Sequence, residues 1–193
     1  MAVGGLGFVM VHALPKFNLT FEEYTDFYWD RRYWLYVHLC AGLFALLSGP
    51  LQFVARLRQR HPGVHRWSGR FYLLGTVTAA VTAVWLAWTS PVPQPLYAIG
   101  LYLVSLLWLA TGWQGWRLIR RRKLDTHREW MIRNYAVTFF FVMFFGIFDG
   151  LTAAGWPEEQ WAVAVTLAVW LGILMPLVTA EWVIRSLRQV PNS

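Results

Sequence analysis

The sequence has few charged residues and almost no cysteine. Only 14% of its 193 residues are charged, and Cys40 is the single cysteine, which excludes an intrachain disulfide bond. The chain also lacks a P-loop, a dinucleotide-binding fingerprint, a zinc-ligand cluster and a serine nucleophile elbow. These absences exclude the enzyme classes that such motifs define.

Most of the residues that are present are apolar. Apolar residues make up 57% of the chain and aromatic residues 18%, which is too much hydrophobic surface for one soluble core. A membrane-spanning helix needs about 20 mostly apolar residues, and four or five segments qualify. The 13 tryptophans also fit a membrane protein, because the indole ring settles at the headgroup boundary.

We therefore expect an all-α integral membrane helical bundle that forms a single membrane domain. It would have five transmembrane helices plus a short N-terminal apolar segment, since residues 2–14 are too short to cross the bilayer. The expected parts are an N-terminal apolar segment and outer surface helix (1–32), a first hairpin (33–88), a second hairpin (96–149) and a last span (160–184).

The basic residues predict the orientation in the membrane. Of the 17 lysine and arginine residues, all except Lys16, Arg31 and Arg32 lie in two turns and the C-terminal tail. By the positive-inside rule these turns and the tail are cytoplasmic. The net charge of +7 thus follows membrane topology, and we expect no nucleic-acid partner. The expected location is the inner (plasma) membrane, multi-pass, with anionic lipid headgroups at the cytoplasmic face.

A duplication relates the two basic turns. A shift of 62 positions pairs Gln114 with Gln52, Arg120 with Arg58, Arg122 with Arg60, His127 with His65 and Arg128 with Arg66. A duplicated helical hairpin places equivalent side chains about a pseudo-twofold axis. The alternative is chance similarity between two arginine-rich segments.

Histidines are the main candidates for chemistry, because an ionisable group at membrane depth is costly and usually functional. His65 and His127 both begin helices at the cytoplasmic boundary, where two facing imidazoles can serve as the axial ligands of a haem b. His12 and His38, both near the outer side, would form a second pair, so that electrons could cross the bilayer. Four arginines could bind the haem propionates, namely Arg66, Arg70, Arg128 and Arg133.

Other functions remain open. A cofactor-free protein could use its cytoplasmic His-Arg turns to cap helices, bind anionic lipid or hold a partner protein. A membrane oxidoreductase could bind quinone with the same histidines. Its partner could be a second copy of the chain in a homo-oligomer, or a separate redox protein. A small transporter would need deeper polar groups. Asp149 and Glu181 lie near the ends of spans, where we expect each to reach water or to pair with a nearby cation.

Three segments resemble the signature of a known family. They are HLCAGLFALLSGPLQF (38–53), HRWSGRFY (65–72) and HREWMIRNYA (127–136), and they resemble the family catalogued as domain of unknown function 2306. The resemblance covers about residues 33–150 and implies a multi-span helical membrane protein without an established activity. It marks as motif positions His38, His65, Arg66, His127, Arg128 and Arg133.

A looser similarity, in arrangement more than in sequence, is to the transmembrane b-type cytochromes, which use paired histidines on neighbouring helices. Their ligand spacing differs from that of this chain, because His65 and His127 stand at helix starts and not in mid-span.

Overall fold

The computed structural model describes residue 17 and residues 28–189, so His12 and the expected N-terminal apolar segment lie outside the described residues. Over the described residues the chain is helical and contains no strand. Five helical segments are long and apolar enough to cross a membrane: Trp29–Phe53, Pro62–Trp88, Pro95–Arg120, Leu124–Ala153 and Glu158–Gln189. The predicted all-α membrane bundle of five spans is confirmed.

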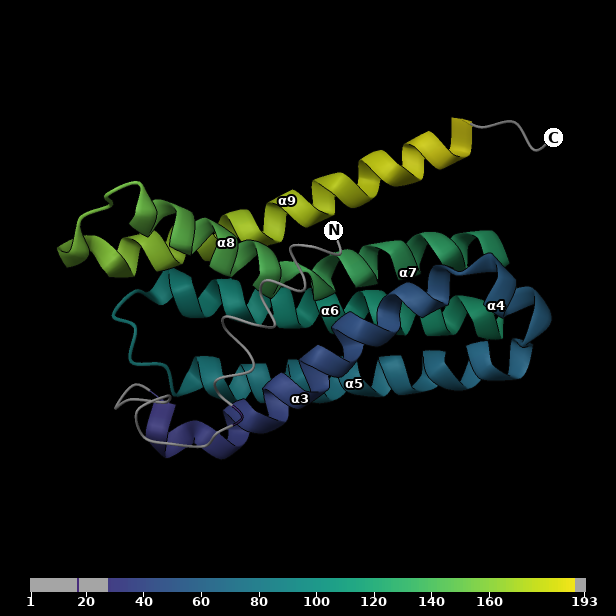
Figure 1. The fold of residues 1–193 in the computed structure, drawn as a ribbon, viewed down its shortest axis with the longest axis horizontal. Coiled ribbons are helices and arrows are strands. Elements are labelled where there is room, and N and C mark those ends of the chain that lie inside the picture. The colour runs from purple at the N-terminus through teal and green to yellow at the C-terminus, as the bar shows by residue number, and fades with distance from the viewer. Residues whose placement is uncertain (1–16, 18–27, 190–193) are drawn as a thin grey trace. The chain divides into compact units, whose positions relative to one another are not determined.

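The chain divides into two compact units, Met1–Pro91 and Val92–Ser193. In the first unit, α3 (Arg32–Ser48) packs along α5 (Pro62–Trp88), as Figure 1 shows. The helices approach closely at Gly75, where an added Cβ would lie 3.1 Å from the carbonyl oxygen of Ala41. Small residues at a helix interface permit this contact in membrane proteins.

A short connection joins α3 to α5. The α-helix ends at Ser48 and is followed by a 3-10 turn, η4 (Gly49–Phe53), which contains Pro50. A six-residue helix, α4 (Ala55–Arg60), follows. The side-chain amide nitrogen of Gln52 donates to the hydroxyl of Ser68 at 2.8 Å, which fixes η4 against the start of α5. His61 then precedes Pro62, the first residue of α5, a position at which proline costs no helical hydrogen bond.

Arg31 caps the far end of α5. Its Nη1 donates to the carbonyl oxygens of Thr89 at 2.8 Å and Leu86 at 3.3 Å, and its side chain is buried. A helix leaves its last carbonyls without partners and carries partial negative charge there, so a buried guanidinium stabilises this end.

The Arg31→Gln variant is therefore expected to lose about 1–3 kcal/mol of stability, the value of hydrogen bonds from a charged donor. Thermal unfolding in detergent, followed by circular dichroism, measures this loss. The matched control is Arg32→Gln, because Arg32 donates only within its own turn, to the carbonyl of Trp29 and the hydroxyl of Tyr33, and stacks on the same two rings. Equal shifts in the two variants would contradict the capping role.

The second unit contains α6 (Pro95–Arg120), α7 (Leu124–Thr138), α8 (Phe140–Ala153) and α9 (Trp161–Gln189). Helix α6 lies beside α7, and α9 packs against both α7 and α8 (Figure 1). The expected fourth span is thus divided at Phe139, whose amide donates to the carbonyls of both Tyr135 and Ala136. The close packing of α6 on α9 depends on Gly100, where an added Cβ would lie 2.4 Å from Cγ1 of Val169.

Candidate functional site

His127 is held by a neighbouring helix. It lies near the start of α7 and is half-buried, and its Nδ1 is 2.8 Å from the carbonyl oxygen of Gly115 in α6. A carbonyl oxygen only accepts, so Nδ1 carries the proton and donates. The neutral ring then presents a lone pair at Nε2. This is the tautomer in which histidine binds metal ions, with its second nitrogen oriented by a backbone carbonyl.

The absence of a side chain at Gly115 leaves room for Met131 beside this contact. An added Cβ would lie 2.7 Å from Sδ of Met131 and 3.9 Å from Nδ1 of His127. The tight turn between α6 and α7 brings the helices together, with Arg122 in the left-handed region at φ 58°. Gly115 and the turn therefore orient the imidazole of His127 together.

His38 has the same type of contact in the first unit. It is 5% exposed in α3, and its Nδ1 donates to the carbonyl oxygen of Ala79 in α5 at 2.9 Å. The hydroxyl of Thr82 lies 3.3 Å from the same nitrogen. The carbonyl again requires the proton on Nδ1, so His38 has the same tautomer as His127.

The other predicted site residues are spread over both units. His65 is half-buried in the first turn of α5, while Arg66 and Arg70 are exposed. The guanidinium of Arg70 lies over the ring of Trp67, 4.7 Å from its centroid. His65 belongs to the first unit and His127 to the second, so their predicted pairing stays a prediction. His12 lies outside the described residues.

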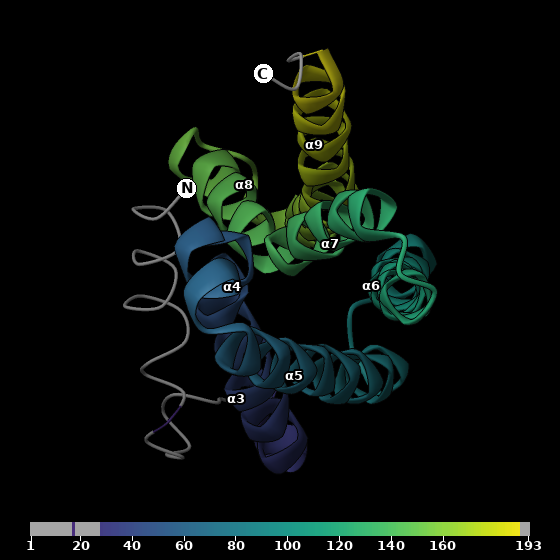
Figure 2. The ribbon, with the colours of Figure 1, turned by 90° about the vertical axis from the view of Figure 1, so that its right-hand side faces the viewer.

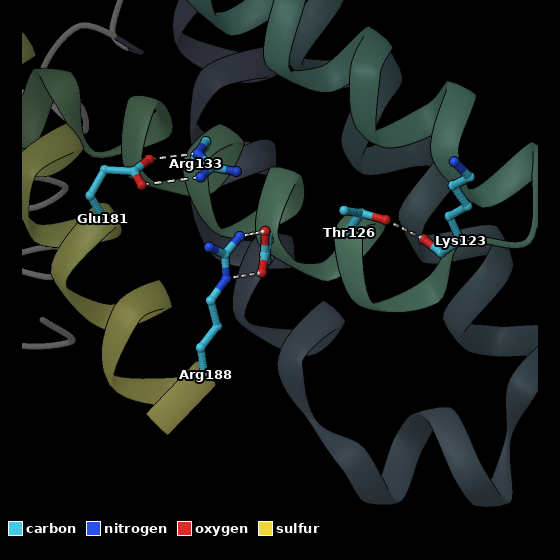
Figure 3. A network of polar contacts seen from close by, with 6 residues as sticks. Lys123, Thr126, Arg133, Glu181 and Arg188 are labelled. Carbon is cyan, nitrogen blue, oxygen red and sulfur yellow. Dashed lines mark hydrogen bonds and ion pairs between the residues drawn. The ribbon is translucent and has the colours of Figure 1, made fainter. Parts of the chain in front are cut away.

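Arg133 makes a bidentate ion pair with Glu181, which Figure 3 shows between α7 and α9. Nε lies 2.6 Å from Oε1, and Nη2 lies 3.1 Å from Oε2. This confirms that Glu181 pairs with a nearby cation. Arg188 and Glu129 form a second two-bond pair between the same helices, at 2.7 and 2.6 Å. These two ion pairs set the register of α7 against α9, because a planar pair with two hydrogen bonds restricts the orientation of both side chains.

Comparison with known proteins identifies the family. A family model described as "Predicted membrane protein (DUF2306)" matches residues 35–184, a range that contains His38, His65 and His127. The chain belongs to the DUF2306 family. No curated protein and no solved structure matches the chain. The DUF2306 description states a membrane protein and no activity, and the looser similarity to b-type cytochromes stays a prediction.

The DUF2306 region also contains a buried polar cluster that our sequence reasoning missed. Asn134 is 0% exposed, and its amide nitrogen donates to the carbonyl of Trp108 at 2.8 Å and to the hydroxyl of Thr111 at 2.9 Å. The indole nitrogen of Trp108 donates to the hydroxyl of Thr138 at 3.0 Å. Such hydrogen bonds join helices in a membrane. They connect α6 and α7 about two helical turns along both helices from the contact of His127 with Gly115.

The spacing of these residues along the sequence could have revealed that they share one face of α7. Positions 127, 131, 134 and 138 follow the pattern i, i+4, i+7 and i+11, which places them on one helix face. His127 and Asn134 therefore share the face of α7 that contacts α6. The positions 62 residues earlier than Asn134 and Thr138 are Tyr72 and Thr76, which are also buried.

No group of three or more histidine, cysteine, aspartate or glutamate side chains that could hold a metal ion occurs in the part of the chain that the structure describes. A haem needs fewer protein ligands, because the macrocycle occupies four positions on the iron and the protein supplies only the axial ones. Within the DUF2306 region, His38 and His127 each offer one oriented imidazole, which is half of the ligand pair that a haem with two histidine ligands would need.

Proposed function

We propose that the protein binds haem b and transfers electrons in the membrane, with His65 and His127 as the axial ligands of one haem. The observation that supports this function best is the hydrogen bond from Nδ1 of His127 to Gly115. It fixes the ring and leaves the lone pair on Nε2, as in metal-binding histidines.

A second haem is proposed at the opposite end of the first unit, with His38 and His12 as its ligands. His38 has the same carbonyl contact as His127, and it is buried at membrane depth, where a polar group is usually functional. Electrons would then pass across the bilayer or to quinone. The proposed location is the inner membrane, with the basic turns and the C-terminus in the cytoplasm.

The arginines have supporting roles in this proposal. Arg66, Arg70 and Arg128 are exposed, so their guanidinium groups can reach the propionates of a haem at the boundary. Arg133 is already oriented by Glu181 through Nε and Nη2, and Nη1 remains the nitrogen for a further acceptor. Bound haem would supply the one-electron chemistry, while these side chains bind and orient it.

Absorption spectroscopy tests the function directly. Protein purified in mild detergent from haem-replete cells is expected to show a Soret band and, after dithionite reduction, the sharp α-band of low-spin haem with two nitrogen ligands. The same preparation from haem-depleted cells, supplied afterwards with haemin, is the control for loading. Absence of both bands from the native and the haemin-supplied protein would refute haem binding.

A further inference from the structure

The short helix α4 and its flanks form an exposed cationic surface at one end of the first unit. In chain order α4 lies between α3 and α5, and Figure 2, which views the structure from this end, shows it beside the start of α5. Three of its six residues are exposed arginines: Arg56, Arg58 and Arg60. Arg66 and Arg70, on the first turns of α5, are exposed as well. We call Arg56, Arg58 and Arg60 the α4 basic surface; Arg66 and Arg70, the proposed ligands of the haem propionates, follow it in the chain.

No carboxylate among the described residues of the first unit lies close enough to neutralise the α4 basic surface. The sequence has no acidic residue between Asp30 and Asp125, and Asp30 lies at the opposite end of α3. Among the described residues, the ion pairs involve Arg133 and Arg188 in the second unit and none of the arginines of this surface. Arginines without a carboxylate partner favour an anionic ligand.

Large apolar side chains surround the charges. The exposed ones near α4 are Leu51, Phe53, Val54, Val64 and Trp67. A soluble acidic partner would leave much of this apolar area in water. The combination of arginine heads, apolar side chains and an indole ring is typical of segments that lie in the headgroup region of a bilayer.

We propose that the α4 basic surface binds the phosphate of anionic phospholipid headgroups, with the neighbouring apolar side chains inserted into the same leaflet. Arginine suits this role, because its planar guanidinium forms paired hydrogen bonds to phosphate oxygens. The bond from Gln52 to Ser68 joins η4 to α5, and the backbone bonds from His61 to Leu57 and from His65 to His61 connect the end of α4 to the start of α5. The surface is therefore present before lipid binds.

The test uses full-length, delipidated protein in detergent, titrated with short-chain phosphatidylglycerol and followed by native mass spectrometry. For the variant R56Q/R58Q/R60Q we expect phosphatidylglycerol to bind about tenfold more weakly or worse, because each surface charge near a headgroup changes binding by about fivefold. Phosphatidylcholine binding should not change. Haem content should not change either, since these three arginines are outside the proposed haem sites.

Two matched variants make the test specific. R56K/R58K/R60K keeps the positive charge and should retain phosphatidylglycerol binding to within about threefold. Most of the attraction to the anionic headgroup comes from that charge, which lysine and arginine share. R120Q/R121Q/R122Q removes the same charge from the other basic turn, and it should weaken binding by less than about threefold, because fewer exposed large apolar side chains, Trp113 and Leu124, lie beside that turn. Equal losses in the two glutamine variants, or no loss in R56Q/R58Q/R60Q, would overturn the proposal. Displacement of the lipid by millimolar inorganic phosphate would show a simple phosphate site and overturn it as well.

Discussion

The His127→Ala variant is expected to lose one haem per chain. Removing the imidazole leaves the iron without one of its two proposed axial ligands, and alanine cannot replace it. Loss of a residue that merely orients a metal ligand costs about 10–100-fold in affinity, so loss of the ligand itself should cost at least as much. The pyridine haemochrome assay counts haem per chain, and the reduced spectrum shows whether low-spin haem remains.

Three further variants control this result. His65→Ala should lose the same haem, and the double variant should lose no more than either single variant. His61→Ala should bind haem normally, because His61 is exposed before the first residue of α5. His38→Ala should remove a different haem, from the outer pair. Unchanged haem content in both His65→Ala and His127→Ala would show that the ligand assignment is wrong.

The Gly100→Ala variant is expected to lose about 1–3 kcal/mol of stability, the usual cost of overpacking a core. The added Cβ would lie 2.4 Å from Cγ1 of Val169, which is 0% exposed. A buried valine in a helix has one preferred rotamer, so its methyl group cannot move aside without moving α9. Thermal unfolding of the detergent-solubilised protein measures the change.

Two variants separate this clash from other effects of alanine. Gly146→Ala is the matched control, because an added Cβ there meets nothing within 4 Å. It should stabilise α8 by up to about 1 kcal/mol, the difference in helix propensity between the two residues. Val169→Ala removes the clashing methyl groups, so Gly100→Ala combined with Val169→Ala should recover part of the loss. If Gly100→Ala and Gly146→Ala had the same effect, the close packing of α6 on α9 would be refuted.

The features of the fold that can be predicted from the sequence follow from the chemistry of short segments. Long apolar runs predict spans because a helix in lipid must satisfy its own backbone hydrogen bonds over the thickness of the membrane. Pro50 explains why α3 ends at Ser48, because proline removes a helical donor. The pairing of Glu181 with a cation followed from the cost of a bare carboxylate beside an apolar run, and Arg133 is the cation.

The division at Phe139 could not be predicted. No proline or glycine lies between Val137 and Phe145, and the apolar run continues through the break. In the structure, α8 is packed against α9, with Phe140 and the backbone of Phe144 close to Gly172. An added Cβ at Gly172 would lie 3.3 Å from both, so the path of α8 depends on a neighbour more than 25 positions away.

The sequence by itself determined that this protein is an all-α membrane bundle and which histidines and arginines lie near the ends of its helices. Composition and apolar length are properties of single segments, and they are sufficient for that conclusion. Only the tertiary structure decided that Arg31 caps α5, that Asn134 joins α7 to α6, and that His38 and His127 carry their protons on Nδ1. Each of these depends on which carbonyl of another helix lies within hydrogen-bond distance, and helix packing alone sets that distance.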